Sequence, residues 1–422
     1  MTEPSTAHRR QGLAPRLAGF FGIPLLSALA PFIILPFVSR IAGQTGWGDI
    51  VAAQAIGGFG AIAVTFGWGI FGPPAVAQTA AEHVRQRLYR DSLVVRGLAT
   101  VFVLPVCLLI TWAVVGPHHL TDSLLMAGAL TLTGLLPSWY CIGIGQPMLM
   151  ARYDVLPRLA AALVSVPLML ATHTIWPYPV LTTLALVLPT AMFTRRILAG
   201  YDASAEPHRS LWAVLRQTAA TAGIDAAGNA YGSTPVPIST ATLSPADGSA
   251  FSSADKLYRV GLTIVVTSIG NAFQGWVLDP AAADRRRRQL LAMGAHAVTG
   301  VLGLVFLATL GPWVTGLVFG TDVAAHRAAA AWYGVAFLFI SLSTPLIRNL
   351  LIPSGRGRFV LAGTIASSIL GLALMGWGAA RHDATLIAFG LASSEVLLVA
   401  LLAGPALRLL PPAAATAGRS AS

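Results

Sequence analysis

Long apolar stretches, separated by short polar segments, run through the whole chain. A helix needs about 20 mostly apolar residues to cross the hydrocarbon core of a bilayer. Membrane β-strands are about ten residues long and alternate in polarity, which these stretches do not. The pattern therefore predicts an all-α polytopic membrane protein with about twelve transmembrane helices. The twelve segments are residues 17–39, 50–72, 93–115, 123–149, 157–176, 179–198, 218–242, 255–278, 292–318, 329–352, 359–378 and 385–406.

The composition excludes two other classes of protein. Hydrophobic residues make up 55% of the chain and charged residues only 10%, whereas soluble domains carry about a quarter charged residues. This excludes an ordinary soluble domain and a disordered chain. The two cysteines, Cys107 and Cys141, lie inside apolar stretches without any paired spacing, so neither a disulfide scaffold nor a zinc module is expected. No metal or cofactor is predicted.

The arginines predict the orientation of the chain. The net charge of +11 would suggest nucleic acid in a soluble protein, but here the charge gathers in alternate loops. With the N-terminus in the cytoplasm, the inner segments hold 21 of the 27 basic residues, Arg96 among them, and the outer loops hold Arg40, Arg327 and Arg381. Basic loops stay cytoplasmic, so both termini are predicted cytoplasmic and no nucleic acid is expected as a partner. A single lysine beside many arginines suggests a GC-rich bacterial genome, and hence a bacterial cytoplasmic membrane.

A shift of 202 residues aligns the two halves of the chain. It brings Gly46 onto Gly248, Ile62 onto Ile264 and Arg85 onto Arg287. The shift also carries the second span onto the eighth, so orientation is kept, and a parallel repeat of two six-helix lobes is predicted. The expected parts are an N-terminal tail (1–16), an N-terminal lobe (17–200), a cytoplasmic connector (201–217), a C-terminal lobe (218–406) and a C-terminal tail (407–422).

Polar residues inside two spans recur at helical spacing. In the seventh span they fall at positions 217, 221, 225, 229 and 233, and in the eighth at 256, 259, 263, 267, 271 and 274. Such spacing places them on one helix face, and polar groups inside a bilayer usually face a bundle interior or a water-filled cavity. A cationic crevice between the lobes is therefore predicted. Its candidate residues are Arg40, Gln54, Asp225, Asn229, Lys256, Arg259, Asn271, Arg348 and Glu395.

Some of these candidates have a second interpretation. Arg40 and Arg348 lie near span ends, where they can extend to the lipid headgroups instead. Glu395 can equally be a structural hydrogen-bonding group inside the bundle. Asp225 is deeper and shares its face with polar neighbours, which favours a functional role. Its expected partner is Lys256 or Arg259.

Two segments carry a family resemblance. Residues 37–43 (FVSRIAG) and 46–54 (GWGDIVAAQ) resemble the first helical hairpin of polysaccharide-export flippases of the O-antigen and teichoic-acid type. These belong to the multidrug/oligosaccharidyl-lipid/polysaccharide (MOP) exporter superfamily. Residues 248–258 (GSAFSSADKLY) are similar to the equivalent segment of the second lobe.

The resemblance implies a pair of six-helix bundles that alternates between inward- and outward-open forms. Its members flip polyprenyl-phosphate-linked glycans from the cytoplasmic to the outer leaflet, and cationic cavity residues engage the phosphates. Arg40, Lys256, Arg259 and Arg348 are the positions here that fit this role. Membrane lipids and polysaccharide polymerases or glycosyltransferases are the implied partners. Arginine suits phosphate because its planar fork offers several donors.

Alternative functions remain open at this stage. A cation-coupled drug exporter of the same superfamily would need an acidic, aromatic-lined cavity. A glycan polymerase or glycosyltransferase would need catalytic groups on a large extramembrane loop, which the short loops disfavour, so no enzyme is expected. A non-transporting scaffold of glycan synthesis also remains. The chain has no Gly-x-x-x-x-Gly-Lys-Ser/Thr segment, so energy would come from an H+ or Na+ gradient, the membrane potential or consumption of the product.

Overall fold

The computed structural model describes residues 13–79, 81–201, 210–277 and 284–410. Within some helices it places the backbone alone, namely at 13–33, 77, 147, 220–221, 224–225, 227–230, 271–272 and 274–276. The described residues form helices joined by short turns, which confirms the predicted all-α polytopic class. The predicted tails (1–16 and 407–422) and the connector (201–217) lie partly outside the described residues.

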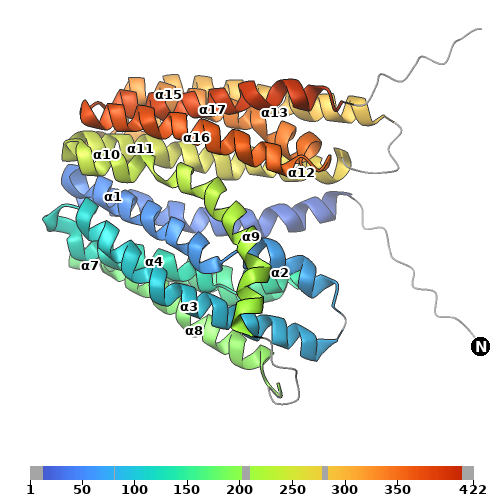
Figure 1. Cartoon of the computed structure of the whole chain (residues 1–422). Coiled ribbons are helices and arrows are strands. Elements are labelled where there is room, and N and C mark those ends of the chain that lie inside the picture. Colours follow the sequence, from blue (N-terminus) through green and yellow to red (C-terminus); the bar gives the residue numbers. More distant parts are fainter. Residues whose placement is uncertain (1–12, 80, 202–209, 278–283, 411–422) are drawn as a thin grey trace, which may run out of the picture.

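The helices form two groups that lie side by side, here called the N-terminal and C-terminal lobes (Figure 1). The N-terminal lobe contains α1 (Leu13–Thr65), α2 (Trp68–Ala77), α3 (Glu82–Val114), η1 (Pro117–His119), α4 (Leu120–Leu132), η2 (Thr133–Leu135), α5 (Ser138–Gly143), α6 (Pro147–Met150), η3 (Ala151–Val155), α7 (Leu156–Thr172) and α8 (Pro177–Ile197). The C-terminal lobe contains η4 (Tyr231–Ser233), α10 (Pro235–Thr242), α11 (Pro245–Gly261), η5 (Leu262–Val266), α12 (Thr267–Val277), α13 (Arg285–Thr309), α14 (Gly311–Phe319), η6 (Thr321–Val323), α15 (Arg327–Pro345), η7 (Leu346–Leu351), α16 (Gly357–Ala380) and α17 (Ala384–Leu407). Between them, α9 (Leu211–Ala230) crosses from one lobe to the other.

Nine helices of the described residues are long and apolar enough to cross a membrane. They match nine of the twelve predicted spans, and the first, seventh and eighth are missing for identifiable reasons. The first predicted span falls mostly on residues 13–33, whose side chains lie outside the described residues. The seventh is divided between α9 and α10, and α11 in the eighth contains two acids and two bases, including Asp255 and Lys256.

The outward-facing side chains of these spans are largely apolar. Val101 and Leu302 are 66% and 64% exposed. Exposing apolar area to water costs about 25 cal/mol per Å², and that cost is removed when lipid covers the same surface. The chain is therefore a multi-pass membrane protein.

The loop that was expected at 40–49 is reduced to a single bent residue. Gly43 adopts φ +60°, ψ −164° within α1, and helical residues continue on both sides of it. Glycine tolerates this positive φ because it has no Cβ. The second predicted span also ends early: Phe66 and Gly67 have positive φ after Thr65, and the rest of that span becomes the separate helix α2.

The predicted seventh span is broken in the middle. The helix begins at Leu211, inside the predicted connector, and ends at Ala230; a single 3-10 turn, η4, then leads into α10. Pro235 and Pro237 cause the break, because a proline ring removes a backbone donor and clashes with the preceding helical turn. The predicted seventh span is therefore formed by two helices, α9 and α10, instead of one straight helix.

Arg96 was counted among the cytoplasmic arginines, and the structure corrects this. It lies within α3 and is fully buried. Its guanidinium donates to the carbonyls of Gly134 at 3.1 Å and Leu136 at 2.9 Å, and it lies over the Trp139 ring with 5.8 Å from Cζ to the ring centroid. Arg96 thereby caps the carbonyl groups that are left free where α4 gives way to η2.

Candidate functional site

The two lobes are fastened together at the end of the molecule where Gly43 lies. Six hydrogen bonds join residues 39–48 of α1 to the C-terminal lobe. The Gly48 amide donates to Ser249 Oγ at 2.9 Å, and Ser249 Oγ donates to the Gln44 carbonyl at 2.7 Å. Residues 39–48, 240–253 and 317–319 are together called the closed end.

The closed end is tightly packed as well as hydrogen-bonded. The Trp47 indole donates to Ser253 Oγ at 2.8 Å, and its ring lies 5.2 Å from that of Phe319. Trp47 and Ser253 are fully buried. A Cβ on Gly48 would lie 3.2 Å from the backbone carbon of Gly248. Glycine at position 48 therefore allows α1 and α11 to approach almost backbone to backbone.

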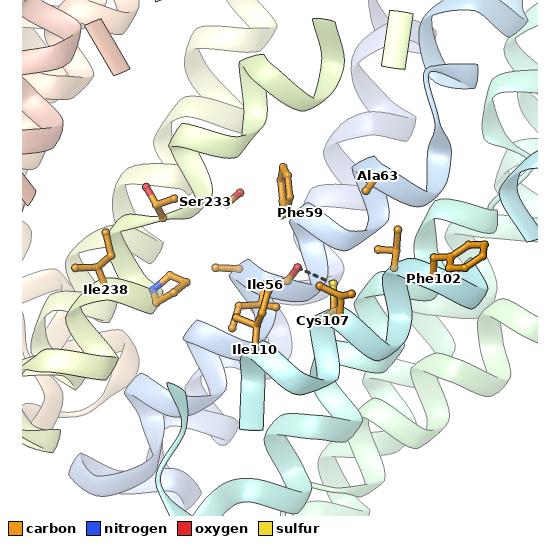
Figure 2. Close-up of a pocket in the computed structure, with 13 residues that line it drawn as sticks. Ile56, Phe59, Ala63, Phe102, Cys107, Ile110, Ser233 and Ile238 are labelled. Atoms are coloured by element: carbon orange, nitrogen blue, oxygen red, sulfur yellow. Dashed lines mark hydrogen bonds between the residues drawn. The ribbon is translucent and has the colours of Figure 1, made fainter. Parts of the chain in front are cut away.

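Beyond the closed end, a cavity of about 500 Å³ lies between the lobes. Figure 2 shows Ile56 and Phe59 of α1 and Ile110 of α3 on one side, with Ser233 of η4 and Ile238 of α10 on the other. The lining is almost entirely apolar. Two of its polar groups contact backbone carbonyls: the Cys107 thiol contacts the Ile56 carbonyl at 3.8 Å, and Thr234 Oγ1 donates to the Tyr231 carbonyl at 2.7 Å.

A second cavity of about 500 Å³ continues from the first. Both cavities share Ala63, Phe102 and Val103. The second is enclosed by α1 and α3 on one side and by the Leu215–Ala226 face of α9 on the other. We call the two cavities together the seam groove, because one wall belongs to the N-terminal lobe and the other to the helices that lead into the C-terminal lobe.

A third cavity of about 430 Å³ lies at the closed end itself. It is lined by Thr45 and Asp49 of α1, by the turn at Gly116–His118 and by the turn at Thr240–Pro245. Asp49 is only 8% exposed. This cavity is thus enclosed by both lobes and is more polar than the seam groove.

A buried ion pair holds the helix break in the C-terminal lobe. Asp255 is 1% exposed, and its Oδ2 lies 2.6 Å from Arg259 Nε, one helical turn away. Tyr333 donates its hydroxyl to Asp255 Oδ1 at 3.3 Å, and Arg259 also donates to the carbonyl of Gly232 in η4. Arg259 therefore connects α11 to the break between α9 and α10.

The structure gathers part of the predicted set in the C-terminal lobe. Lys256, half-buried, is within electrostatic range of Asp255 and Arg259. Glu395, also half-buried, is within range of Tyr231 and Tyr258. Three cavity candidates, Asp225, Asn229 and Asn271, have side chains outside the described residues and remain predictions.

The other predicted cations and the glutamine lie elsewhere. Arg40 is exposed at the closed end, where Nη2 donates to the Leu317 carbonyl at 3.2 Å. Arg348 is half-buried in η7. Its guanidinium lies close to α12, because a Cβ added to Gly270 would be 2.9 Å from Arg348 Nη1. Gln54 is buried against Met126 of its own lobe. The six candidates whose side chains the structure describes are therefore spread over several places in the fold.

Sequence reasoning missed Asp255 and the seam groove. The spacing of Asp255 and Arg259 was available in the sequence, since residues four apart on a helix are neighbours. The groove had no such signal: its apolar side chains look the same in sequence whether they face lipid, a helix or a hollow.

The fold, two lobes closed at one end and separated by cavities beyond it, defines a class of membrane protein among known structures. No family model matches the sequence, and no curated protein matches it. An inward-facing multidrug resistance MATE family transporter of the MOP superfamily matches with TM-score 0.68 and 13% identity, over 93% of this chain and 98% of the other. The lipid II flippase MurJ, in an inward closed conformation, matches with TM-score 0.65 and 10% identity, over 93% of this chain and 87% of the other.

A third solved structure is a MOP superfamily transporter from Pyrococcus furiosus Vc1 (DSM3638), in which reverse polarity of the binding pocket suggests a different function. It matches with TM-score 0.56 and 14% identity, over 94% of each chain. The chain therefore has the fold of MOP superfamily transporters.

Proposed function

We propose that this chain is a transporter that flips a polyprenyl-phosphate-linked oligosaccharide or cell-wall precursor from the cytoplasmic to the outer leaflet. The observation that carries the proposal is the arrangement of the lobes: one end is closed by α1, α11 and α14, and cavities follow along the seam beyond it. The bacterial cytoplasmic membrane is its proposed location, with both termini in the cytoplasm.

The physical need for such a protein follows from the substrate. A phosphate-linked glycan is too polar and hydrated to cross hydrocarbon unaided, whereas its apolar lipid tail partitions into the hydrocarbon core. With the N-terminus inside, the closed end faces outward, so this form would receive substrate from the cytoplasm. We propose that Lys256 and Arg348, with Asp225, Asn229 and Asn271, contact the head group as it crosses, and that Arg40 meets it near the outer surface.

A leaflet-accessibility assay tests the proposal. Purified protein is reconstituted into vesicles with a fluorescent polyprenyl-diphosphate disaccharide, and a membrane-impermeant reductant bleaches the outer-leaflet probe. Protein-containing vesicles should lose nearly all fluorescence, and protein-free vesicles about half. Lys256→Ala should slow the loss without loss of insertion, and Arg195→Ala on α8 is the control. Equal bleaching with and without protein would contradict the proposal.

A second candidate is a cation-coupled exporter of small amphiphiles. Each cavity of the seam groove, at about 500 Å³, lies within the usual ~300–1,000 Å³ range of small-ligand sites. Expression in a drug-sensitive host separates the two. If the host becomes more resistant to lipophilic cationic drugs and the protein is inactive in the glycolipid assay, the exporter is favoured. An H+ or Na+ gradient is the proposed energy source for either function.

A further inference from the structure

We propose that the seam groove holds the polyprenyl chain of the transported glycolipid while its head group crosses between the lobes. This inference rests on the proposed function and specifies where the apolar half of the substrate travels. The groove is defined by α1 residues 55–66, α3 residues 95–110 and the α9–α10 segment 215–238.

The apolar side chains that line the groove favour a hydrocarbon chain as its occupant. A ridge of α3 side chains at four-residue spacing, Leu98, Phe102, Val106 and Ile110, runs along the groove and is 38–66% exposed. Among the side chains that the structure describes, those that line the two cavities carry no charge. A saccharide or phosphate would leave its polar groups unpaired against such a wall, at a cost of several kcal/mol per group.

The length of the groove selects a long chain. Its α3 wall extends from Val95 to Ile110, which corresponds to about 22 Å along the axis of a helix. One leaflet contributes only about half of the roughly 30 Å hydrocarbon core. The wall is therefore longer than one leaflet is thick, so a chain lying in it reaches from one leaflet into the other. An ordinary phospholipid chain is confined to its own leaflet.

The groove lies where its occupant would contact both lobes. It lies further along α1 than the closed end: Ala55 and Ile56, which line the first cavity, follow residues 39–48 on the same helix. The opposite wall is α9 and the break before α10, the segment through which the chain passes from one lobe to the other. A chain in the groove therefore touches both lobes along their contact and would follow any movement between them.

Photolabelling tests the proposal on the unaltered protein. The full-length chain is reconstituted in phosphatidylethanolamine–phosphatidylglycerol vesicles with a polyprenyl-diphosphate disaccharide that carries a diazirine on its isoprenoid chain. Labelled peptides are then mapped by mass spectrometry. Labels should concentrate in 95–110 and 215–238, and unlabelled polyprenyl phosphate should compete for them whereas excess phosphatidylglycerol should not. The lipid-facing surface of α13 around Val298 and Leu302, 60% and 64% exposed, is the internal reference. Equal labelling of groove and reference, or equal competition by phosphatidylglycerol, would overturn the proposal.

A blocking variant supplies the second measurement. Ala63 lines both cavities, so Ala63→Trp should divide the groove and slow flipping at least about tenfold, a change equivalent to about 1.4 kcal/mol. Ala160→Trp, on an exposed face of α7, is the matched control and should flip at the wild-type rate. Wild-type flipping by Ala63→Trp would overturn the groove assignment and leave the proposed function standing. Failure of the wild-type protein to flip any glycolipid would instead overturn the proposed function, and groove labelling by the isoprenoid probe would still support the binding site.

Discussion

Two arginines of this protein, Arg96 and Arg259, hold backbone breaks in place. Arg96 donates to Gly134 and Leu136 where α4 ends, and Arg259 donates to Gly232 between α9 and α10. At each break the helical hydrogen-bond pattern is interrupted, and an unsatisfied carbonyl in a buried place is costly. A guanidinium suits this task because it has five donors in a fixed fork. These arginines are therefore first of all structural.

Replacement of Arg96 by methionine should lower stability. The variant keeps the length of the side chain but leaves two carbonyls without their donor, and each unsatisfied group costs about 1–3 kcal/mol. We expect a clear fall in Tm in detergent, measured by the temperature dependence of monodisperse protein. Arg90→Met, at a half-buried site nearer the start of the same helix, should change it little. Equal Tm values for the two variants would show that the Arg96 contacts contribute nothing.

The Asp255–Arg259 ion pair predicts that the stability effects of replacing its two residues depend on each other. Arg259→Met removes the ion-pair partner of the Asp255 carboxylate, which is 1% exposed, and this should cost more than about 1 kcal/mol even though Arg259 itself is about a third exposed. Adding Asp255→Asn removes the uncompensated charge and should restore part of the stability. A double-mutant cycle on thermal unfolding measures this coupling. Strict additivity of the two changes would contradict the ion pair.

At the scale of single residues, the sequence predicted side-chain chemistry better than side-chain partners. Arg259 was recognised as an intramembrane cation, but its partner is Asp255 on the same helix. Arg96 was missed because it was attributed to topology together with the other arginines of its cytoplasmic cluster. Partners across helices, such as Tyr333 with Asp255, depend on packing that one-dimensional spacing does not contain.

At the scale of elements, glycines determine how closely the helices of the N-terminal lobe pack. A Cβ on Gly57 would lie 2.5 Å from the Ala127 carbonyl oxygen of α4, and one on Gly134 would meet Val64 of α1. The neighbouring Gly58 has open space around its Cβ position. Gly57 therefore marks the contact face of α1, and Gly58 does not.

Two alanine substitutions in adjacent positions test this packing. Gly57→Ala should destabilise the protein by about 1–3 kcal/mol, since backbone of α4 must move to accommodate the methyl group. Gly58→Ala should be neutral or stabilising by up to about 1 kcal/mol, because alanine favours a helix over glycine. Unfolding in denaturant, followed by tryptophan fluorescence, provides the comparison. A larger loss for Gly58→Ala would contradict the α1–α4 contact.

The sequence predicted most elements because spans are set by runs of apolar residues. The prediction from sequence was less accurate where a bend or a helix break lies inside a span. The bend at Gly43, the early end of the second span at Thr65 and the break at η4 each depend on one or two glycines or prolines. Many other prolines lie in helices that continue through them, such as Pro105 and Pro167, so residue type alone does not reveal which proline breaks its helix.

At the scale of the whole molecule, the orientation in the membrane remains a prediction. Cysteines introduced at opposite ends test it: Ala246→Cys on α11 and Ser354→Cys before α16 are both exposed sites, and native Cys107 and Cys141 are buried. In intact cells, an impermeant maleimide should label Ala246→Cys directly and Ser354→Cys only after permeabilisation. The reverse pattern would place the closed end in the cytoplasm and invert the proposed direction of transport.

The central claim is that transport requires the closed end to open. Thr45 and Ser244 line the same 430 Å³ cavity from opposite lobes, so Thr45→Cys and Ser244→Cys together can be joined by a short bifunctional thiol reagent with a reducible spacer. The account predicts that the cross-linked protein stops flipping the polyprenyl-diphosphate disaccharide, that reduction restores flipping, and that either single variant treated in the same way stays active. Flipping at the wild-type rate by fully cross-linked protein would contradict it.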